Sequence, residues 1–201
     1  VFNAGSALGA NASAIHALAT TLVSAAAGLL SWLVIEKMVG SKPSLVGAST
    51  GLVAGLVAIT PGAGYVSVGA ALIIGALVSP LCYFAISVLK KKWNYDDALD
   101  AFGCHGVGGI FGGLMTALFT DPRLTPEAGN VGLLFGSSHL LLATLFAILL
   151  TMVWSGGVTW LILFLVKQFQ PLRVTERQEI LGLDESEHEE TAYPTFLGLD
   201  T

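Results

Sequence analysis

Charge is scarce in this 201-residue chain, since Asp, Glu, Lys and Arg together make up 11% of it. Four long stretches carry none of these residues, namely Val1–Ile35, Pro43–Leu89, Ala101–Thr120 and Ala128–Val166. A helix needs roughly 20 apolar residues to cross a hydrocarbon layer of ~30 Å. The hydrophobic fraction of 54% and the mean hydropathy of +0.75 fit that requirement. The lack of charge argues against a soluble domain and a nucleic-acid-binding surface, and it predicts a membrane protein.

Cysteine is rarer still. Cys82 and Cys104 both fall within uncharged stretches, which argues against a disulfide framework and against a zinc site. We expect neither a metal nor another cofactor. The chain begins at Val1 rather than at Met, inside an apolar segment, and we expect the start of that helix to lie upstream.

Turn and capping residues divide the uncharged stretches into five spans after an N-terminal stub at residues 1–10. Asn11-Ala12-Ser13 is a plausible helix start, and Thr60-Pro61-Gly62-Ala63-Gly64 is a strong turn signal. We expect Asp96-Asp97 to cap the fourth span and Asp121-Pro122 to close it. The fold class is therefore all-α, a polytopic membrane protein whose transmembrane region covers residues 1–170. The expected spans are 13–37, 44–59, 66–89, a fourth ending near Phe119, and 137–166, which at ~45 Å must tilt or protrude.

Lysine and arginine indicate the orientation of these spans. With five alternating spans, one side of the membrane receives eight cations and the other side receives Arg123 alone. Cytoplasmic loops carry the excess of Lys and Arg, so we expect a cytoplasmic C-terminus. The eight cations are Lys37, Lys42, Lys90, Lys91, Lys92, Lys167, Arg173 and Arg177.

The composition changes at residues 171–201, which hold eight acids and two arginines. We expect an acidic cytoplasmic tail in which Thr175 caps a helical turn or two and residues 184–190 form a solvated acidic run. Two interpretations stay open, a flexible tail or a docking segment for a regulatory protein. Ser186 or Thr175 could also be phosphorylated, which would add charge to this segment.

Of the four histidines, His105 is the one for which we expect a functional role. His188 lies in the tail, and His16 and His139 lie near outer span ends. His105 is expected two helical turns inside the fourth span, where an ionisable group is costly and by default marks a functional pathway. A neutral imidazole there can both donate and accept a hydrogen bond.

The face around His105 is mostly small. Gly108/Gly112 and Gly109/Gly113 form two overlapping GxxxG pairs, which permit close helix packing. One interpretation is a packing face whose histidine bonds a neighbouring carbonyl, and the other is a narrow lumen beside a polar imidazole. The α-helical neighbours three, four and seven positions from His105 are Ala98, Ala101, Phe102, Gly108, Gly109 and Gly112.

Asp96, Asp97 and Asp100 are expected in the first turns of the same helix. Carboxylates at a helix N-terminus cap free N–H groups and complement the helix dipole, which is the simple interpretation for the first two. Asp100 is ~140° around an α-helix from His105, so we do not expect these two side chains to pair. Asp100 would instead brace a neighbouring helix or attract cations at an inner mouth.

The residues from Asp96 to Gly109, DDALDAFGCHGVGG, resemble the signature of the ammonium transporters, the Amt/Mep/Rh superfamily. The opening FNAGSA at 2–7 is similar to the sixth transmembrane helix of that family, and residues 42–48, 54–61 and 154–156 match later helices. The tail from Leu172 to Tyr193 also matches, and with the opening it fits the Amt branch better than the Rhesus branch.

This resemblance implies a fold of eleven transmembrane helices, built from two inverted five-helix halves and a long tilted eleventh helix. The chain would supply the end of helix six and helices seven to eleven. Family members are homotrimers in the cell membrane with one pore in each subunit. PII-type nitrogen-signalling proteins dock on the cytoplasmic face of such transporters.

The resemblance further implies transport of ammonium or ammonia with no enzymatic step. Ammonium is recruited at an outer site, loses its proton and crosses a hydrophobic pore lined by two hydrogen-bonded histidines. His105 matches the second histidine, Phe2 a phenylalanine gate at the outer mouth and Ser6 a serine of the recruitment site. Without the resemblance, Phe2 is a membrane-packing residue and the Ser6 hydroxyl bonds its own helix backbone. Two other hypotheses remain, an ammonium sensor on the same scaffold and a structural membrane subunit.

Overall fold

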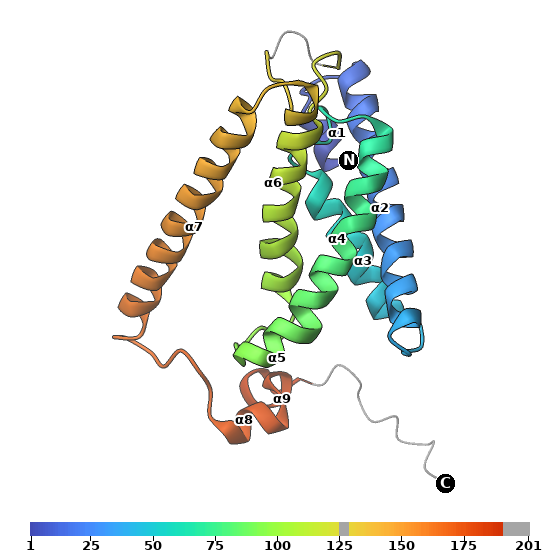
Figure 1. Cartoon of the computed structure of the whole chain (residues 1–201). Coiled ribbons are helices and arrows are strands. Elements are labelled where there is room, and N and C mark those ends of the chain that lie inside the picture. The colour runs from blue at the N-terminus through green and yellow to red at the C-terminus, as the bar shows by residue number, and fades with distance from the viewer. Residues whose placement is uncertain (125–128, 191–201) are drawn as a thin grey trace. The chain divides into compact units, whose positions relative to one another are not determined.

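The computed structural model describes residues 1–124 and 129–190, and nearly all of this chain is helical or in turns (Figure 1). The extended pairing within these residues is an isolated bridge between Val66 and Thr120. The chain forms two compact units, Val1–Leu150 and Thr151–Thr201. The expected all-α fold class is confirmed.

In the first unit, the short α1 (Phe2–Gly5) precedes the long α2 (Ala12–Met38) and α3 (Leu45–Ile59). Helix α4 (Val68–Phe84) continues through a π-helical turn, η1 (Ala85–Leu89), into α5 (Lys90–Trp93). A second π-helical turn, η2 (Phe102–Gly106), leads into α6 (Val107–Phe119). The 3-10 turn η4 (Leu133–Phe135) then precedes α7 (His139–Val166), in which the two units join. The second unit contains α8 (Glu176–Leu181) and α9 (Leu183–His188).

The expected spans are found with one error at a helix start. Residues 12–38, 68–93, 102–119 and 139–166 form helices long and apolar enough to cross a membrane. Helix α3 has 15 residues and is therefore short, at ~22 Å. The fourth span begins later than expected, because Asp96 and Asp97, which were expected in its first turns, precede it. Asn94 adopts a left-handed conformation and ends α5, and residues 95–100 form turns and irregular backbone before the next helix begins.

Helices α2, α3 and α4 pack very closely because glycines face backbone at their contacts. A Cβ on Gly55 of α3 or on Gly75 of α4 would overlap the backbone of Ser24 in α2. Hydroxyls use this proximity to bond carbonyls across the contact: Ser24 Oγ donates to Gly55 O at 2.9 Å, and Ser79 Oγ donates to Gly28 O at 2.7 Å. Small residues and interhelical hydroxyl bonds are the usual means of packing helices in membranes.

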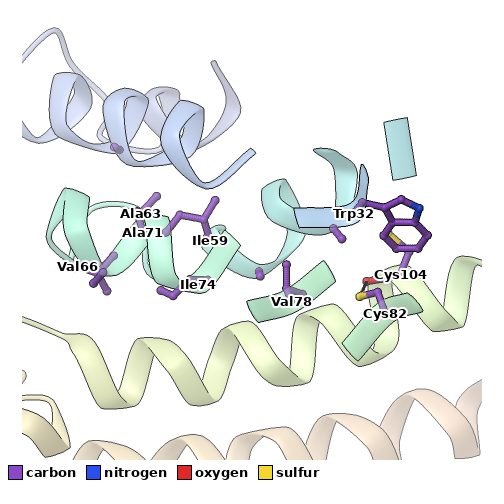
Figure 2. Packing of buried hydrophobic residues seen from close by; sticks show 13 residues of the cluster. Trp32, Ile59, Ala63, Val66, Ala71, Ile74, Val78, Cys82 and Cys104 are labelled. Carbon is purple, nitrogen blue, oxygen red and sulfur yellow. Dashed lines mark hydrogen bonds between the residues drawn. The ribbon is translucent and has the colours of Figure 1, made fainter. Parts of the chain in front are cut away.

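The core lies along this helix contact (Figure 2). Its fully buried aliphatic side chains come from α3, α4 and the turn between them, and include Ile59, Val66, Ile74 and Val78. At one end Trp32 meets the ring of Tyr83 edge-on, with centroids 5.4 Å apart. The two cysteines are free and buried, and the Cys82 thiol contacts the carbonyl of Cys104 at 3.8 Å.

A buried carboxylate fastens the start of α3. Glu36, in the last turn of α2, is 8% exposed, and its oxygens accept hydrogen bonds from the Ser44 N–H and hydroxyl, both at 2.9 Å. Ser44 in turn caps α3 by accepting from the N–H of Gly47. Glu36, which follows the first uncharged stretch, therefore connects the end of α2 to the start of α3.

The two GxxxG pairs of α6 have different surroundings. Gly112 lies against α3, where a Cβ would overlap the backbone of Ala58, and Gly108 lies near Val57. Gly109 has no atom within 4 Å of its Cβ position among the described residues. Within the part of the chain that the structure describes, the Gly108/Gly112 pair packs against α3, and the Gly109/Gly113 pair does not share that contact.

The second unit contains the expected helical turn of the tail. Thr175 caps α8 in a reciprocal capping box with Gln178. Arg173 donates to Glu179 at 2.6 Å, and this hydrogen bond holds the pKa of the Glu179 carboxyl below its usual value. The expected acidic run at residues 184–190 is largely exposed, and most of it forms α9. Ala192 and Tyr193 of the tail motif lie outside the described residues.

Candidate functional site

His105 lies in the first turn of its helix, so its expected depth of two turns is wrong. The helix begins only after Asp100, whose left-handed backbone (φ 55°) ends the preceding turn. The imidazole is exposed and lines a cavity of about 550 Å³. The other lining residues come mainly from α3, namely Leu45, Val46, Ser49, Thr50 and Val53, together with Leu99, Ala101 and Cys104.

His105 also lies in a π-helical turn, which changes the neighbours expected from α-helical spacing. Ala98, expected on its face, precedes the helix altogether. Gly103 packs on Ile86 of η1, where a Cβ would overlap the isoleucine side chain, so the two π-helical turns touch. Single π-helical turns within α-helices are found frequently at functional sites.

The three aspartates lie before the helix rather than in its first turns. Asp97 still caps it, because its two carboxylate oxygens accept from the N–H groups of Ala101 at 2.8 Å and Phe102 at 2.9 Å. Asp96 is exposed in the same turn. Asp100 forms an ion pair with Lys90 of α5 at 2.7 Å, and thus connects this loop to the neighbouring helix.

Phe2 and Ser6 line a second, smaller cavity of about 240 Å³ at the other end of α3. The Ser6 hydroxyl donates to the carbonyl of Phe2 at 3.3 Å, which is the helix-backbone bond expected from its sequence alone. Asn3, between them, donates to Thr21 Oγ1 of α2 at 3.1 Å and so holds α1 in place. Thr60 and Tyr65 of the loop after α3 line the same cavity.

The loop after α3 is fastened by polar contacts on both sides. His16 Nε2 lies 2.8 Å from the carbonyl of Val66, so this histidine has a structural role. The N–H of Asp121 donates to the carbonyl of Tyr65 at 2.9 Å. Arg123 donates to both carboxylate oxygens of Asp121, Nε to Oδ1 at 2.9 Å and Nη2 to Oδ2 at 2.6 Å, and these bonds hold the pKa of the Asp121 carboxyl below its usual value.

Sequence reasoning missed the hydroxyl residues that line the two cavities. Ser49 and Thr50 lie in the His105 cavity and Thr60 in the smaller one. An adjacent pair of hydroxyl residues within an otherwise apolar, glycine-rich helix was the available signal. The two cavities thus lie at opposite ends of α3, with His105 towards its N-terminal end and Phe2 and Ser6 near its C-terminal end.

Comparison with known proteins gives consistent matches. The model of the Ammonium Transporter Family matches residues 1–193. A putative ammonium transporter of Methanothermobacter thermautotrophicus is 46% identical over 192 residues, which cover 96% of this chain and 47% of that protein. The chain therefore spans about half the length of the curated relatives it matches.

Solved structures match the fold as well as the sequence. The crystal structure of Candida albicans Mep2 is 34% identical with a TM-score of 0.80, over 88% of this chain and 40% of that chain. A structure described as a Sensor Amt Protein is 28% identical with a TM-score of 0.82, over 92% of this chain and 45% of that chain.

Proposed function

This chain belongs to the ammonium transporter family, and we propose that the protein containing it transports ammonium or ammonia across the cell membrane. The observation that carries the proposal is His105. Its imidazole is exposed to a cavity whose α3 wall combines aliphatic side chains with two hydroxyls. No hydrogen bond joins the His105 side chain to another residue in the described ranges 1–124 and 129–190, so its ring nitrogens are available to a small polar solute.

The proposed mechanism separates recruitment from conduction. Ammonium is recruited at the cavity lined by Phe2 and Ser6, loses its proton there, and passes as ammonia. Moving a hydrated cation into an apolar lumen is prohibitive, whereas a neutral polar molecule costs far less. His105, as one of a histidine pair, offers hydrogen bonds to ammonia and a route for the released proton. Potassium has no proton to release, which accounts for discrimination between two ions of similar size and charge.

The wider arrangement follows from the family and from the charge distribution. We propose a multi-pass protein in which residues 1–170 form the second half of an ammonium transporter fold and residues 171–201 form a cytoplasmic tail. Eight cations on one side against Arg123 on the other support that orientation. A homotrimer, and a PII-type protein docking at the tail, complete the proposal.

One further function has a specific observation in its favour. The similarity to the Sensor Amt Protein, together with helices α8 and α9 in the tail, fits an ammonium sensor that signals through its C-terminus. A sensor would bind ammonium without net uptake. Uptake measured with the transporter alone, and again with a separately expressed partner, distinguishes the two functions.

The experiment is uptake of labelled methylammonium by cells that lack their own ammonium transporters and express the full-length protein. We expect His105→Leu to assemble normally but to change conduction or the discrimination against potassium. His139→Leu is the matched control, because His139 is an exposed histidine at the start of α7. Wild-type uptake and unchanged discrimination in His105→Leu would refute the assignment of His105 to the pore.

A further inference from the structure

Lys90 is bonded unlike the two lysines that follow it. Its ammonium group donates to the carbonyl of Asp97 and to the carboxylate of Asp100, the latter at 2.7 Å. Lys90 is partly buried, with 29% of its side chain exposed, whereas Lys91 and Lys92 are exposed. Lys90 thus contacts both ends of the short loop 97–100.

That loop determines where the helix of His105 begins. Asp97 caps the helix through the N–H groups of Ala101 and Phe102, and the carbonyl of Asp100 accepts from the N–H of Cys104 at 2.9 Å. Asp100 has a left-handed backbone (φ 55°), which aspartate adopts more readily than most residues with a Cβ but which still costs free energy. The ion pair with Lys90 is a contact that stabilises it.

We propose that Lys90 is a positioning residue for His105. By holding Asp97 and Asp100 together, its ammonium group fixes the first residue of η2 and therefore the π-helical register in which His105 faces its cavity. The close contact of Gly103 with Ile86 of η1 makes this register sensitive to small shifts, because η1 leads directly into Lys90. This inference rests on the proposed function, since the orientation of His105 matters only if the cavity conducts a solute.

The two cavities allow positioning to be separated from recruitment. Phe2 and Ser6 line a different cavity at the other end of α3, so the apparent KM for methylammonium should depend on them and not on Lys90. Displacing His105 should lower the maximal uptake rate instead. Conduction involves no covalent step, so the size of the loss depends on how far the imidazole moves from the path of the solute.

The experiment measures methylammonium uptake by the full-length protein, normalised to the amount in the membrane. Lys90→Met should lower the maximal rate with the KM unchanged, and Lys90→Arg, which keeps the charge and its donors, should restore most of that rate. Lys91→Met, an equal change of charge on the next and exposed residue, should behave like the unaltered protein. If Lys90→Met does not accumulate, Asp100→Asn tests the same ion pair from its other side.

A double-variant cycle separates positioning from a general loss of structure. If Lys90 acts through His105, Lys90→Met should have no further effect on uptake once His105→Leu is present. Multiplicative losses in the double variant, or equal maximal rates in Lys90→Met and Lys91→Met, would overturn the positioning role while leaving the proposed function intact. Absence of uptake by the unaltered protein would overturn the proposed function and this inference with it.

Discussion

Gly75 offers a quantitative test of the helix packing that forms the core. In the Gly75→Ala variant the new methyl group would lie 2.8 Å from both the Cα and the carbonyl carbon of Ser24. Carbon atoms normally approach to about 3.5–4.0 Å, so α4 and α2 would have to separate by nearly 1 Å. The atoms in the way are backbone, which cannot move aside as a flexible side chain can.

The expected cost has two parts. Overpacking of a close contact costs about 1–3 kcal/mol. The separation would also stretch the hydroxyl bond from Ser79 to Gly28, at 2.7 Å, and such interhelical bonds are worth about 0.6 kcal/mol each in a membrane protein. The higher helix propensity of alanine offsets about 0.5–1 kcal/mol of this cost. We therefore expect Gly75→Ala to lower the free energy of unfolding by about 1–3 kcal/mol.

The assay is unfolding of the full-length protein in mild detergent by a rising fraction of sodium dodecyl sulfate, followed by circular dichroism and tryptophan fluorescence. Gly157→Ala is the matched control, because no atom of the described residues lies within 4 Å of its Cβ position on α7. An alanine in a helix interior is favoured over glycine by about 0.5–1 kcal/mol, so the control should be neutral or slightly stabilised. Equal unfolding midpoints for the two variants would refute the close-packing argument.

Three other predictions concern the loops, the assembly and the tail. The pKa of Asp121 is lowered in the folded protein, so its contribution to stability should be present at neutral pH and lost as the pH falls through that pKa. The melting temperatures of the unaltered protein and of Asp121→Asn should therefore converge on acidification. A difference in melting temperature that stays constant with pH would contradict this prediction. The detergent-solubilised full-length protein should have the mass of three protomers plus detergent, and a monomer that still transports would count against the trimer. In a pull-down at low salt, a version ending at Pro171 should retain less PII-type protein than the intact protein does. Moderate salt should reduce this difference because the tail is acidic. Equal retention by both versions would remove the tail from the regulatory proposal.

The helices themselves were predictable because length and uncharged composition determine a membrane span. Asn11 and Ser44 could be recognised in the sequence as helix starts. Each accepts a hydrogen bond from the N–H three residues ahead. Thr175 could be recognised as the cap of α8 in the same way. In each of these cases the signal is local, since the capping residue and the amide that it binds are neighbours in the chain.

The surroundings of His105 were not predictable in the same way. The cap by Asp97 was expected, but its carboxylate binds N–H groups four and five residues ahead, and Lys90 holds the loop from another helix. Glu36 lies near the end of an expected span, but its burial depends on Ser44 at the start of the next helix. The contacts of Lys90 and Glu36 join different elements, which spacing along one helix does not reveal.

The shortness of α3 has a consequence for the rate at which a solute can cross. Its 15 residues span ~22 Å, against ~30 Å for the hydrocarbon of a typical bilayer. Cavities lie at both of its ends, and water entering them would shorten the dehydrated distance further. The diffusive flux of a neutral molecule varies inversely with the distance over which it is dehydrated. Under the proposed function, a cavity wall built on a short helix would therefore speed permeation of ammonia.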